Sequence, residues 1–397
     1  MSHQLGIPKA AMNSLIQLVD HDIQVKPGME VVILANSDGL YGSDNWCDET
    51  AVGWIKTVCT SRGANVSILW VDYQATEHAW RFSPVVKGAM TDADVLINLS
   101  TDLVVEEVAE FRNYLEVCKT WYVRMFPVTA NMLMSKWAQT PHELVCMIRH
   151  ISSDPFMNPP QKFKMTDPLG TDLEGTALEP KKRAGIPGMP YNSWRRDASH
   201  YIPYPEWVHP PINTTDVNGV FVFDCMLPWW ARYIGIPSSW QEPIRIDVKD
   251  SRMVKISGGI EAKKLENFLK VMETKVGDGM WKFDTFHFGI HPNASVNEIE
   301  CPSPDYRRIV DHSHTSNVHW HIGSAPGNEK YNYYPHITGD IRNQTVTVGN
   351  VKVWDNGYLC CLDDPRLAEI AAKYPGLPGI PARPGRVEEP EFAGAAK

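Results

Sequence analysis

The chain has 397 residues, which is more than one ordinary hydrophobic core holds and is typical of two domains. Its hydrophobic content of 43% is sufficient for packed interiors, and a formal net charge of -9 argues against a nucleic-acid partner. No stretch reaches the roughly 18 apolar residues that a membrane-spanning helix needs. We therefore expect a globular protein that binds neither nucleic acid nor a membrane.

The N-terminal residues and the cysteines bear on the cellular compartment. The N-terminus reads MSHQLGIPKAAMNSL and lacks the charged-then-apolar order of a signal peptide. The eight cysteines are scattered and form no CxxC pair, so reduced structural thiols are expected. Both observations predict a cytoplasmic protein.

The first part of the chain alternates helical and strand patterns. Apolar spacing predicts helices, whereas short unalternating apolar runs predict buried parallel strands. The predicted helices cover residues 10–24 and 47–61, and the predicted strands cover 31–35, 66–71 and 94–98. We expect a doubly wound α/β domain with a parallel sheet over residues 1–154. The first strand is not followed by GxGxxG, so the dinucleotide-binding fingerprint is absent.

Residues 155–215 differ in composition from what precedes them. They are rich in proline, tyrosine and tryptophan and show little periodicity. Long loops without their own secondary structure are uncommon unless they serve a site. Because solvated linkers rarely carry large aromatic side chains, we predict a wall of loops that borders a functional site.

The last part of the chain predicts an α+β domain over residues 216–373. Asn218-Gly219 precedes an apolar run and indicates a hairpin turn. The remaining predicted elements are a hairpin of strands 243–248 and 253–256, a helix over 261–274, and a hairpin of strands 345–348 and 351–354. Residues 374–397 are rich in proline and glycine near their start, and we expect an extended tail that either wraps over a surface or is disordered.

Half of the fourteen histidines lie in one short stretch. They are His287, His291, His312, His314, His319, His321 and His336. A neutral imidazole offers a lone pair at ordinary pH, so histidine is the commonest side-chain metal ligand. The density of histidines makes a metal site the first hypothesis, and a set of hydrogen-bonded surface imidazoles is the alternative.

His287 and His336 stand out within this stretch because each lies at a predicted junction of strand and loop. A side chain there is held by the sheet and still faces a cavity. Two histidines with one carboxylate and open positions form the facial triad of non-haem Fe(II) oxygenases. Zinc hydrolases use similar donors, so ligand type alone does not separate the two classes.

Two further histidine pairs have the spacing that places both side chains on one side of a strand. The first pair is His312 and His314, and the second is His319 and His321. One site with three ligands cannot use both pairs. We expect His312 and His314 to line an entrance or to form a hydrogen-bonded cluster.

The sequence resembles the 2,5-dihydroxypyridine 5,6-dioxygenases, Fe(II) enzymes related in fold to the aminopeptidase T type of metallo-aminopeptidase. The most specific part of the resemblance spans residues 243–340 and reads PIRIDVKDSRMVKISGGIEAKKLENFL, FHFGIHPNASV, and HIGSAPG followed by YYPHITGDI. A more diffuse part includes VKPGMEVVIL, SRGANVSILWVD, DADVLINL and TDPLGTDL. The resemblance implies an aminopeptidase T-like fold with a C-terminal metal-binding domain.

The resemblance also implies a ligand set. His287 matches the first histidine ligand of the dioxygenases, where the aminopeptidase relatives have a glutamate. His336 matches the histidine of a His-x-Asp pair, but Thr338 stands at the carboxylate position. The third ligand is then Asp340, two residues further on, or it comes from His321 or His319.

Other residues follow from the same resemblance. The dioxygenases use a pocket histidine before the C-terminal domain, and His200 lies near that place as a candidate base. An imidazole with a pKa of about 6.5 suits proton transfer near neutral pH. The nearby His209 is expected to be an ordinary hydrogen-bonded loop residue. The candidate substrate-binding residues are His291, Thr338 and Trp207.

These observations predict an Fe(II)-dependent dioxygenase that cleaves the ring of a hydroxylated, nitrogen-containing aromatic compound such as a dihydroxypyridine. Its partners would be the aromatic substrate, dioxygen and further copies of the chain in a homo-oligomer. The first alternative is a metal-dependent hydrolase of amides or peptides that uses Zn(II) or Mn(II). The second is a non-catalytic metal-binding or ligand-binding protein in which Thr338 marks a lost site.

Overall fold

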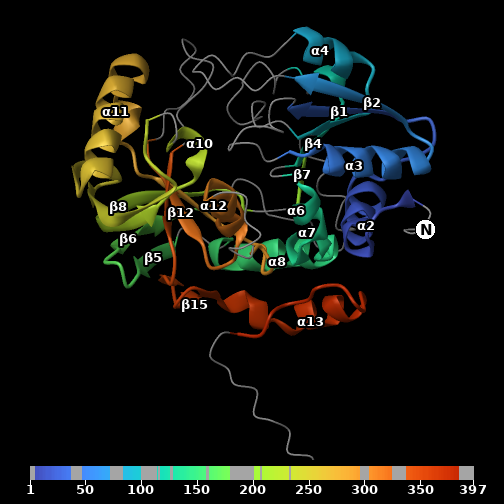
Figure 1. Cartoon of the computed structure of the whole chain (residues 1–397). Coiled ribbons are helices and arrows are strands. Elements are labelled where there is room, and N and C mark those ends of the chain that lie inside the picture. The colour runs from blue at the N-terminus through green and yellow to red at the C-terminus, as the bar shows by residue number, and fades with distance from the viewer. Residues whose placement is uncertain are drawn as a thin grey trace, which may run out of the picture.

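In the computed structural model, the residues described are 5–36, 47–71, 84–99, 114, 117–125, 128–157, 161–178, 201–205, 208–231, 234–295, 304–323 and 337–383. They form two β-sheets with helices around and between them (Figure 1). We call the part built on the parallel sheet the parallel-sheet half, and the part built on the antiparallel sheet the antiparallel-sheet half.

The parallel sheet has the strand order β2-β1-β3-β4-β7, and every pair in it is parallel. Its strands are β1 (Glu30–Asn36), β2 (Asn65–Val71), β3 (Val95–Asn98), β4 (Trp121–Met125) and β7 (Tyr201–Tyr204). The β3 segment is buried at every position, as expected for a strand covered on both faces. The three strands predicted from apolar runs are thereby confirmed.

Helices pack around the parallel sheet and lead out of it. They are α2 (Lys9–Ile16), the π-helix η1 (Gln17–Ile23), α3 (Glu49–Ser61), α4 (Pro84–Thr91), α6 (Ala130–Met134), α7 (Lys136–Gln139) and α8 (His142–Ser153), followed by the short η3 (Asp154–Phe156). Asp48 caps α3 by accepting a hydrogen bond of 2.7 Å from the Ala51 N–H, which satisfies an otherwise unpaired donor of the first turn. The predicted helices at 10–24 and 47–61 are confirmed, the first as an α-helix that continues into a π-helix.

The antiparallel sheet has the order β13-β12-β11-β8-β6-β5-β14-β15-β16, with β9 beside β8 and β10 beside β9. Its strands are β5 (Gln161–Thr166), β6 (Asp172–Ala177), β8 (Ile212–Cys225), β9 (Ser239–Lys249), β10 (Arg252–Ser257), β11 (Thr285–Phe288), β12 (Val318–His321), β13 (Thr338–Ile341), β14 (Thr345–Val348), β15 (Val351–Asp355) and β16 (Tyr358–Leu359). The predicted hairpins at 243–256 and 345–354 are confirmed, and the predicted helix at 261–274 is α11 (Ile260–Val276).

The prediction of loops for residues 155–215 is wrong in four places, the last of which is the start of β8 at Ile212. Residues 161–166 and 172–177 form the β5–β6 hairpin, and residues 201–204 form β7 at the edge of the parallel sheet. Strands β5 and β6 alternate exposed charged or polar residues with single buried residues such as Phe163, Met165 and Leu173, so they lack the long apolar run on which the prediction depended.

The prediction of a hairpin turn at Asn218-Gly219 is also wrong. These residues lie inside the single long strand β8, which pairs with β6 on one side and with β9 on the other. Gly219 has φ +124°, and a side chain added there would collide with the backbone carbonyl of Asp172. The glycine therefore serves close approach of two strands instead of a turn.

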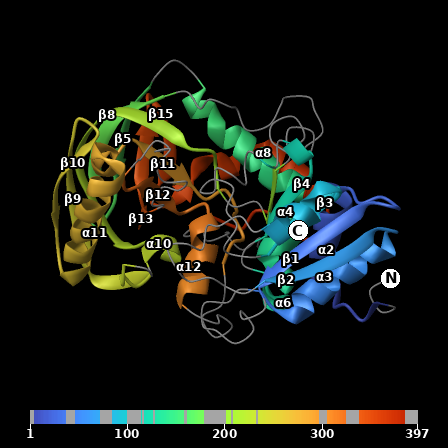
Figure 2. The ribbon, with the colours of Figure 1, turned by 90° about the horizontal axis from the view of Figure 1, so that it is seen from above.

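Two helices flank the antiparallel sheet. The first, α11, lies on its outer side, whereas α12 (Pro304–Ser313) lies between the two halves (Figure 2). The hydroxyl groups of Tyr306 on α12 and Thr129 in the parallel-sheet half are 3.1 Å apart. One continuous cluster of buried apolar side chains joins both halves, so α12 is packed from both sides.

The C-terminal part runs beneath α8 (Figure 1). Helix α13 (Pro365–Ala372) packs on α8, and a short 3-10 helix, η5 (Cys360–Asp363), precedes it. After α13, the Tyr374 hydroxyl donates to Glu143, and Arg383 donates to Asp355. Residues 374–383 thus wrap over a surface, while the rest of the tail lies outside the described residues.

None of the helices in the described ranges has the length and apolar character needed to cross a membrane.

Candidate metal centre

The candidate site lies on three neighbouring strands, β11, β12 and β13. Their register places His287 opposite His319, and His319 opposite Asp340. Directly opposed residues of antiparallel strands project from the same face, and residues two apart on a strand do so as well. His287, His319, His321 and Asp340 therefore share one face of the sheet.

The opposite face of the same strands is aromatic. Phe286 and Trp320 alternate with the histidines and are fully buried. The Trp320 ring stacks on Phe283 with ring centroids 4.5 Å apart, and its indole N–H donates to the sulfur of Met165. The histidine face is thus braced from behind by packed aromatic rings, which fixes the strand backbones that carry it.

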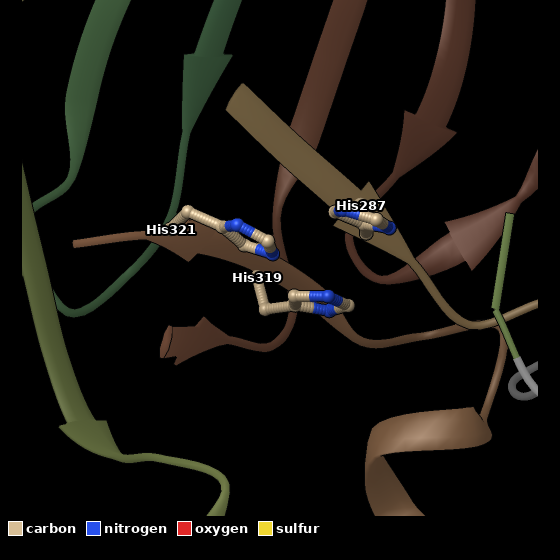
Figure 3. Close-up of side chains that lie close together, drawn as sticks. All are labelled: His287, His319 and His321. Carbon is tan, nitrogen blue, oxygen red and sulfur yellow. The ribbon is translucent and has the colours of Figure 1, made fainter. Parts of the chain in front are cut away.

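His287, His319 and His321 converge (Figure 3). Each contributes one ring nitrogen, and these three nitrogens lie within 4.8 Å of one another. The His287 ring is nearly parallel to both partners, with centroid distances of 5.1 Å to His319 and 4.6 Å to His321. Among the described residues, this is the one group of three or more histidine, cysteine or acidic side chains with such spacing.

The ring of His287 is oriented by a backbone carbonyl. Its Nδ1 lies 3.1 Å from the carbonyl oxygen of His209. A carbonyl oxygen only accepts, so Nδ1 carries the proton, and the lone pair of the neutral ring is at Nε2. Ligating histidines in metalloproteins commonly donate their second N–H to a carbonyl in this way.

His209 itself is held firmly. Its backbone N–H donates to the Phe288 carbonyl at 2.8 Å, and its ring stacks on the Phe288 ring. Nδ1 donates to the Pro210 carbonyl, and Nε2 accepts from the Ser153 hydroxyl at 2.8 Å. Burial, together with the nearby charge of Arg149, lowers the pKa of His209 to about 3, so the ring stays neutral and supports the chain.

His312 lies next to the three histidines but comes from a helix. The interpretation of His312 and His314 as a strand pair is wrong, because Pro304–Ser313 form α12 and bury Tyr306, Ile309 and Val310 at helical spacing. The ring centroid of His312 is 3.8 Å from that of His319. Its Nδ1 is 3.1 Å from Oδ2 of Asp340.

Asp340 is buried in a network of its own. Its carboxylate accepts from His312 and from the Thr338 hydroxyl, and it lies 3.5 Å from Nε of Arg308. Burial raises the pKa of Asp340, but His312, Arg308 and Thr338 together outweigh burial and hold this pKa below its ordinary value. The carboxylate thus faces His312 and Arg308, and it is not one of the three convergent donors.

Two of the candidate substrate-binding residues, His291 and Thr338, are described, and Thr338 lies opposite His321 in the register of β12 and β13. His291 is 1% exposed and packs edge-on against Trp137, and burial lowers its pKa to about 3. Thr338 is fully buried; besides its contact with Asp340, its hydroxyl accepts from the Leu227 N–H at 3.3 Å. Three further candidates, His200, Trp207 and His336, lie outside the described residues.

Sequence reasoning identified two residues of the candidate site only as alternatives, and it missed two contacts that support them. It singled out His319 and His321 as alternatives, and their alternation on a strand was the signal. It did not pair His312 with Asp340, which are 28 positions apart and lie on a helix and a strand. The carbonyl of His209 leaves no signal in the sequence, because every residue has one.

Comparison with solved structures defines the fold class. The structure of 2,5-dihydroxypyridine dioxygenase from Pseudomonas putida KT2440 is similar with a TM-score of 0.59 and 13% identity, over 88% of this chain and 96% of that one. AmpT from Thermus thermophilus is similar with a TM-score of 0.52 and 12% identity, over 90% of this chain and all of that one. At such identities the likeness shows the fold alone.

The chain therefore has an aminopeptidase T-like fold, with a parallel-sheet α/β half and an α+β half, as predicted. No protein-family profile matches the chain, and no curated protein matches it in sequence.

Proposed function

We propose that the protein is a metal-dependent enzyme whose ligands are His287, His319 and His321, and that it is an Fe(II) dioxygenase that cleaves a hydroxylated, nitrogen-containing aromatic ring. The observation that carries the proposal is the convergence of three imidazole nitrogens within 4.8 Å. The fold shared with a 2,5-dihydroxypyridine dioxygenase supports the reaction class. In this ligand set, His319 and His321 replace the expected His336 and Asp340.

The three side chains fit a divalent transition metal. Imidazole is a good ligand for Fe(II) and Zn(II), and three protein ligands leave positions for other molecules. The hydrogen bond from His287 to the His209 carbonyl prepares Nε2 for coordination. When bound, Fe(II) would supply a redox-active centre at which an electron-rich ring and dioxygen react.

The surrounding residues would orient the histidine ligands and exclude water from one side of the centre. The packed rings of Phe286 and Trp320 exclude water from the back of the strands. His312, held by Asp340, packs against the ring of His319 and restricts its rotation. We further propose His200 as the base that takes a proton from a ring hydroxyl and Trp207 as a stacking surface for the ring.

A hydrolase is the second candidate. The chain shares its fold with AmpT as well as with the dioxygenase, and three histidines with an open position also form catalytic zinc sites. In that case the bound metal would activate water, and the same three histidines would hold it.

The deciding experiment is metal analysis of protein purified without oxygen, followed by oxygen-uptake measurements with 2,5-dihydroxypyridine and simple catechols. We expect about one iron per chain, as one three-histidine site requires, together with substrate-dependent oxygen uptake. Zinc or manganese without oxygen uptake, and hydrolysis of amide substrates, would favour the hydrolase. Protein that binds none of these metals would refute both.

A further inference from the structure

The C-terminal strap, which we define as residues 374–383, is fixed at both ends by polar contacts. At its start, the Tyr374 hydroxyl donates to the Glu143 carboxylate on α8. At its end, Arg383 pairs with Asp355, the last residue of β15, at 2.6 Å. The strap therefore runs from the parallel-sheet half to the antiparallel-sheet half.

The strap is held only weakly along its length. The ion pair of Arg383 with Asp355 is partly exposed to water, and such pairs contribute little stability. Pro375, Pro378 and Pro381 lack an N–H, and the strap is neither helix nor strand. Because a segment with few stabilising contacts opens at a low free energy, the contact in the middle of the strap becomes important.

The middle of the strap contacts Asn293. Nδ2 of Asn293 donates to the Gly379 carbonyl at 2.8 Å and to the Thr140 hydroxyl at 3.0 Å. Thr140 lies between α7 and α8 in the parallel-sheet half, and its own hydroxyl hydrogen is donated to the Lys136 carbonyl. An amide nitrogen carries two hydrogens, so both are used. One side chain thus joins the segment after β11 to the strap and to the parallel-sheet half.

Asn293 lies six residues after the proposed ligand His287. Between them, the backbone N–H groups of Gly289 and His291 each donate at 3.0 Å to a carbonyl at the end of α12 or just before β12. A side chain added at Gly289 would overlap the His314 carbonyl, so the segment is tightly packed. A shift of Asn293 would therefore be passed along a short and closely packed stretch of chain toward His287.

We infer that the C-terminal strap positions the segment after β11 through Asn293, and that Asn293 is thereby a positioning residue for His287. The link to function rests on the proposed metal centre. Release of the strap removes one of the two hydrogen bonds of the Asn293 amide and loosens the backbone that carries His287. Any event that displaces the strap, such as cleavage of the chain before Gly379, then weakens metal binding.

The first test removes the contact with the strap and keeps the size of the side chain. In Asn293→Asp the carboxylate only accepts, so it cannot bond to the Gly379 carbonyl. We expect the amide hydrogens of Gly289 and His291 to exchange about fivefold faster, as the loss of one hydrogen bond predicts. Asn267→Asp adds the same charge at an exposed position of α11 and should leave both exchange rates unchanged.

A shortened chain tests the strap itself. A chain that ends at Gly376 loses Gly379 and Arg383 but keeps Tyr374, whereas a chain that ends at Arg383 keeps the whole strap and is the control. We expect the shorter chain to show the same increase in exchange as Asn293→Asp. Its affinity for Co(II) should fall about tenfold, the lower end of the effect of removing a group that supports a metal ligand. The visible absorption of Co(II) reports the ligands around it, so the spectrum should change as well, which a loss of overall stability alone would not cause.

The outcomes separate the inference from the proposed metal centre. If exchange at Gly289 and His291 is unchanged in both Asn293→Asp and the shorter chain, the strap does not position the segment and the inference is wrong. If exchange increases but Co(II) affinity and spectrum keep their wild-type values, Asn293 does not position His287, and the inference is again wrong while the metal centre stands. Wild-type protein that binds no Co(II) would refute the metal centre itself. Exchange is measured without metal, and Asn293→Asp needs no shortened chain, so the test holds even where that chain does not fold.

Discussion

The two sheets of this molecule use their faces differently. In the parallel sheet, the central strand β3 is buried at every position and is apolar except for Asn98 at its end. In the antiparallel sheet, β11 and β12 place aromatic rings on one face and histidines on the other. A strand with two apolar faces can only be packed, whereas a strand with one polar face can hold a site against a rigid support. Substitutions on the aromatic face of β11 and β12 should therefore affect mainly stability, whereas substitutions on the histidine face should affect mainly metal binding.

The largest effect on stability is expected from the aromatic face. Trp320→Ala removes a fully buried side chain that stacks on Phe283, and it should lower the free energy of unfolding by about 3 to 5 kcal/mol. Urea denaturation measures this value. Ile33 in β1 is also fully buried. Ile33→Ala should lower the free energy of unfolding by about 2 to 5 kcal/mol and should leave metal binding intact. A small loss in Trp320→Ala would show that the aromatic face does not brace the site.

The second largest loss of stability is expected for Asp340→Ala. It leaves the buried Arg308 without its nearest carboxylate, and loss of one partner of such a pair costs about 3 kcal/mol or more. Metal content should remain close to that of the wild-type protein, because Asp340 is not among the convergent donors. Complete loss of metal from a folded Asp340→Ala protein would restore Asp340 as a ligand.

His287→Ala should separate function from stability. We expect its unfolding free energy to change by less than about 1 kcal/mol, because the side chain is half-buried and lies on the polar face. Its bound metal, measured after dialysis, should fall to below about a tenth of the wild-type value. The matched control is His21→Ala, which changes an exposed histidine far from His287 in the sequence and should keep the metal.

The smallest effect concerns pH. Burial lowers the pKa of His291 to about 3, below its unfolded value of about 6.5, so the unfolded chain binds the proton more readily. The stability from the neutral ring is present above about pH 6.5 and is lost as the pH falls toward the folded pKa, by about 1 to 2 kcal/mol at pH 5. His291→Gln should flatten the difference in unfolding free energy between pH 7 and pH 5. An unchanged pH dependence in this variant would place His291 in contact with solvent.

The parts of the fold that are predictable from the sequence are those governed by local patterns. The strands β1, β2 and β3 are recognisable from their own apolar residues alone. The turn at Asp250-Ser251 is recognisable because it lies between two strands with alternating apolar and polar residues. The prediction of a turn at Asn218-Gly219 was wrong because a glycine that permits a turn also permits two strands to approach closely. Which of the two occurs depends on Asp172, a residue 47 positions earlier in the chain.

The candidate site shows the same limit. The histidine-rich stretch indicated a metal centre, and alternation placed His319 and His321 on one side of a strand. The choice between Asp340 and these histidines depends on Arg308 and His312, whose helix was not predicted. Contacts between a helix and a strand far apart in sequence follow from packing, which no local pattern encodes.

The hydrogen bond between the Ser153 hydroxyl and the His209 ring is one of the links between the two halves. Helix α8 begins at His142, beside the π-helix of the parallel-sheet half, and ends at Ser153 against the segment whose carbonyl orients His287. Helix α8 therefore connects the two halves, and a shift of α8 would act on the segment whose carbonyl orients His287. A displacement where the two halves meet would thus change the ligand geometry of a bound metal and its absorption spectrum, even if the displacement began far from the substrate.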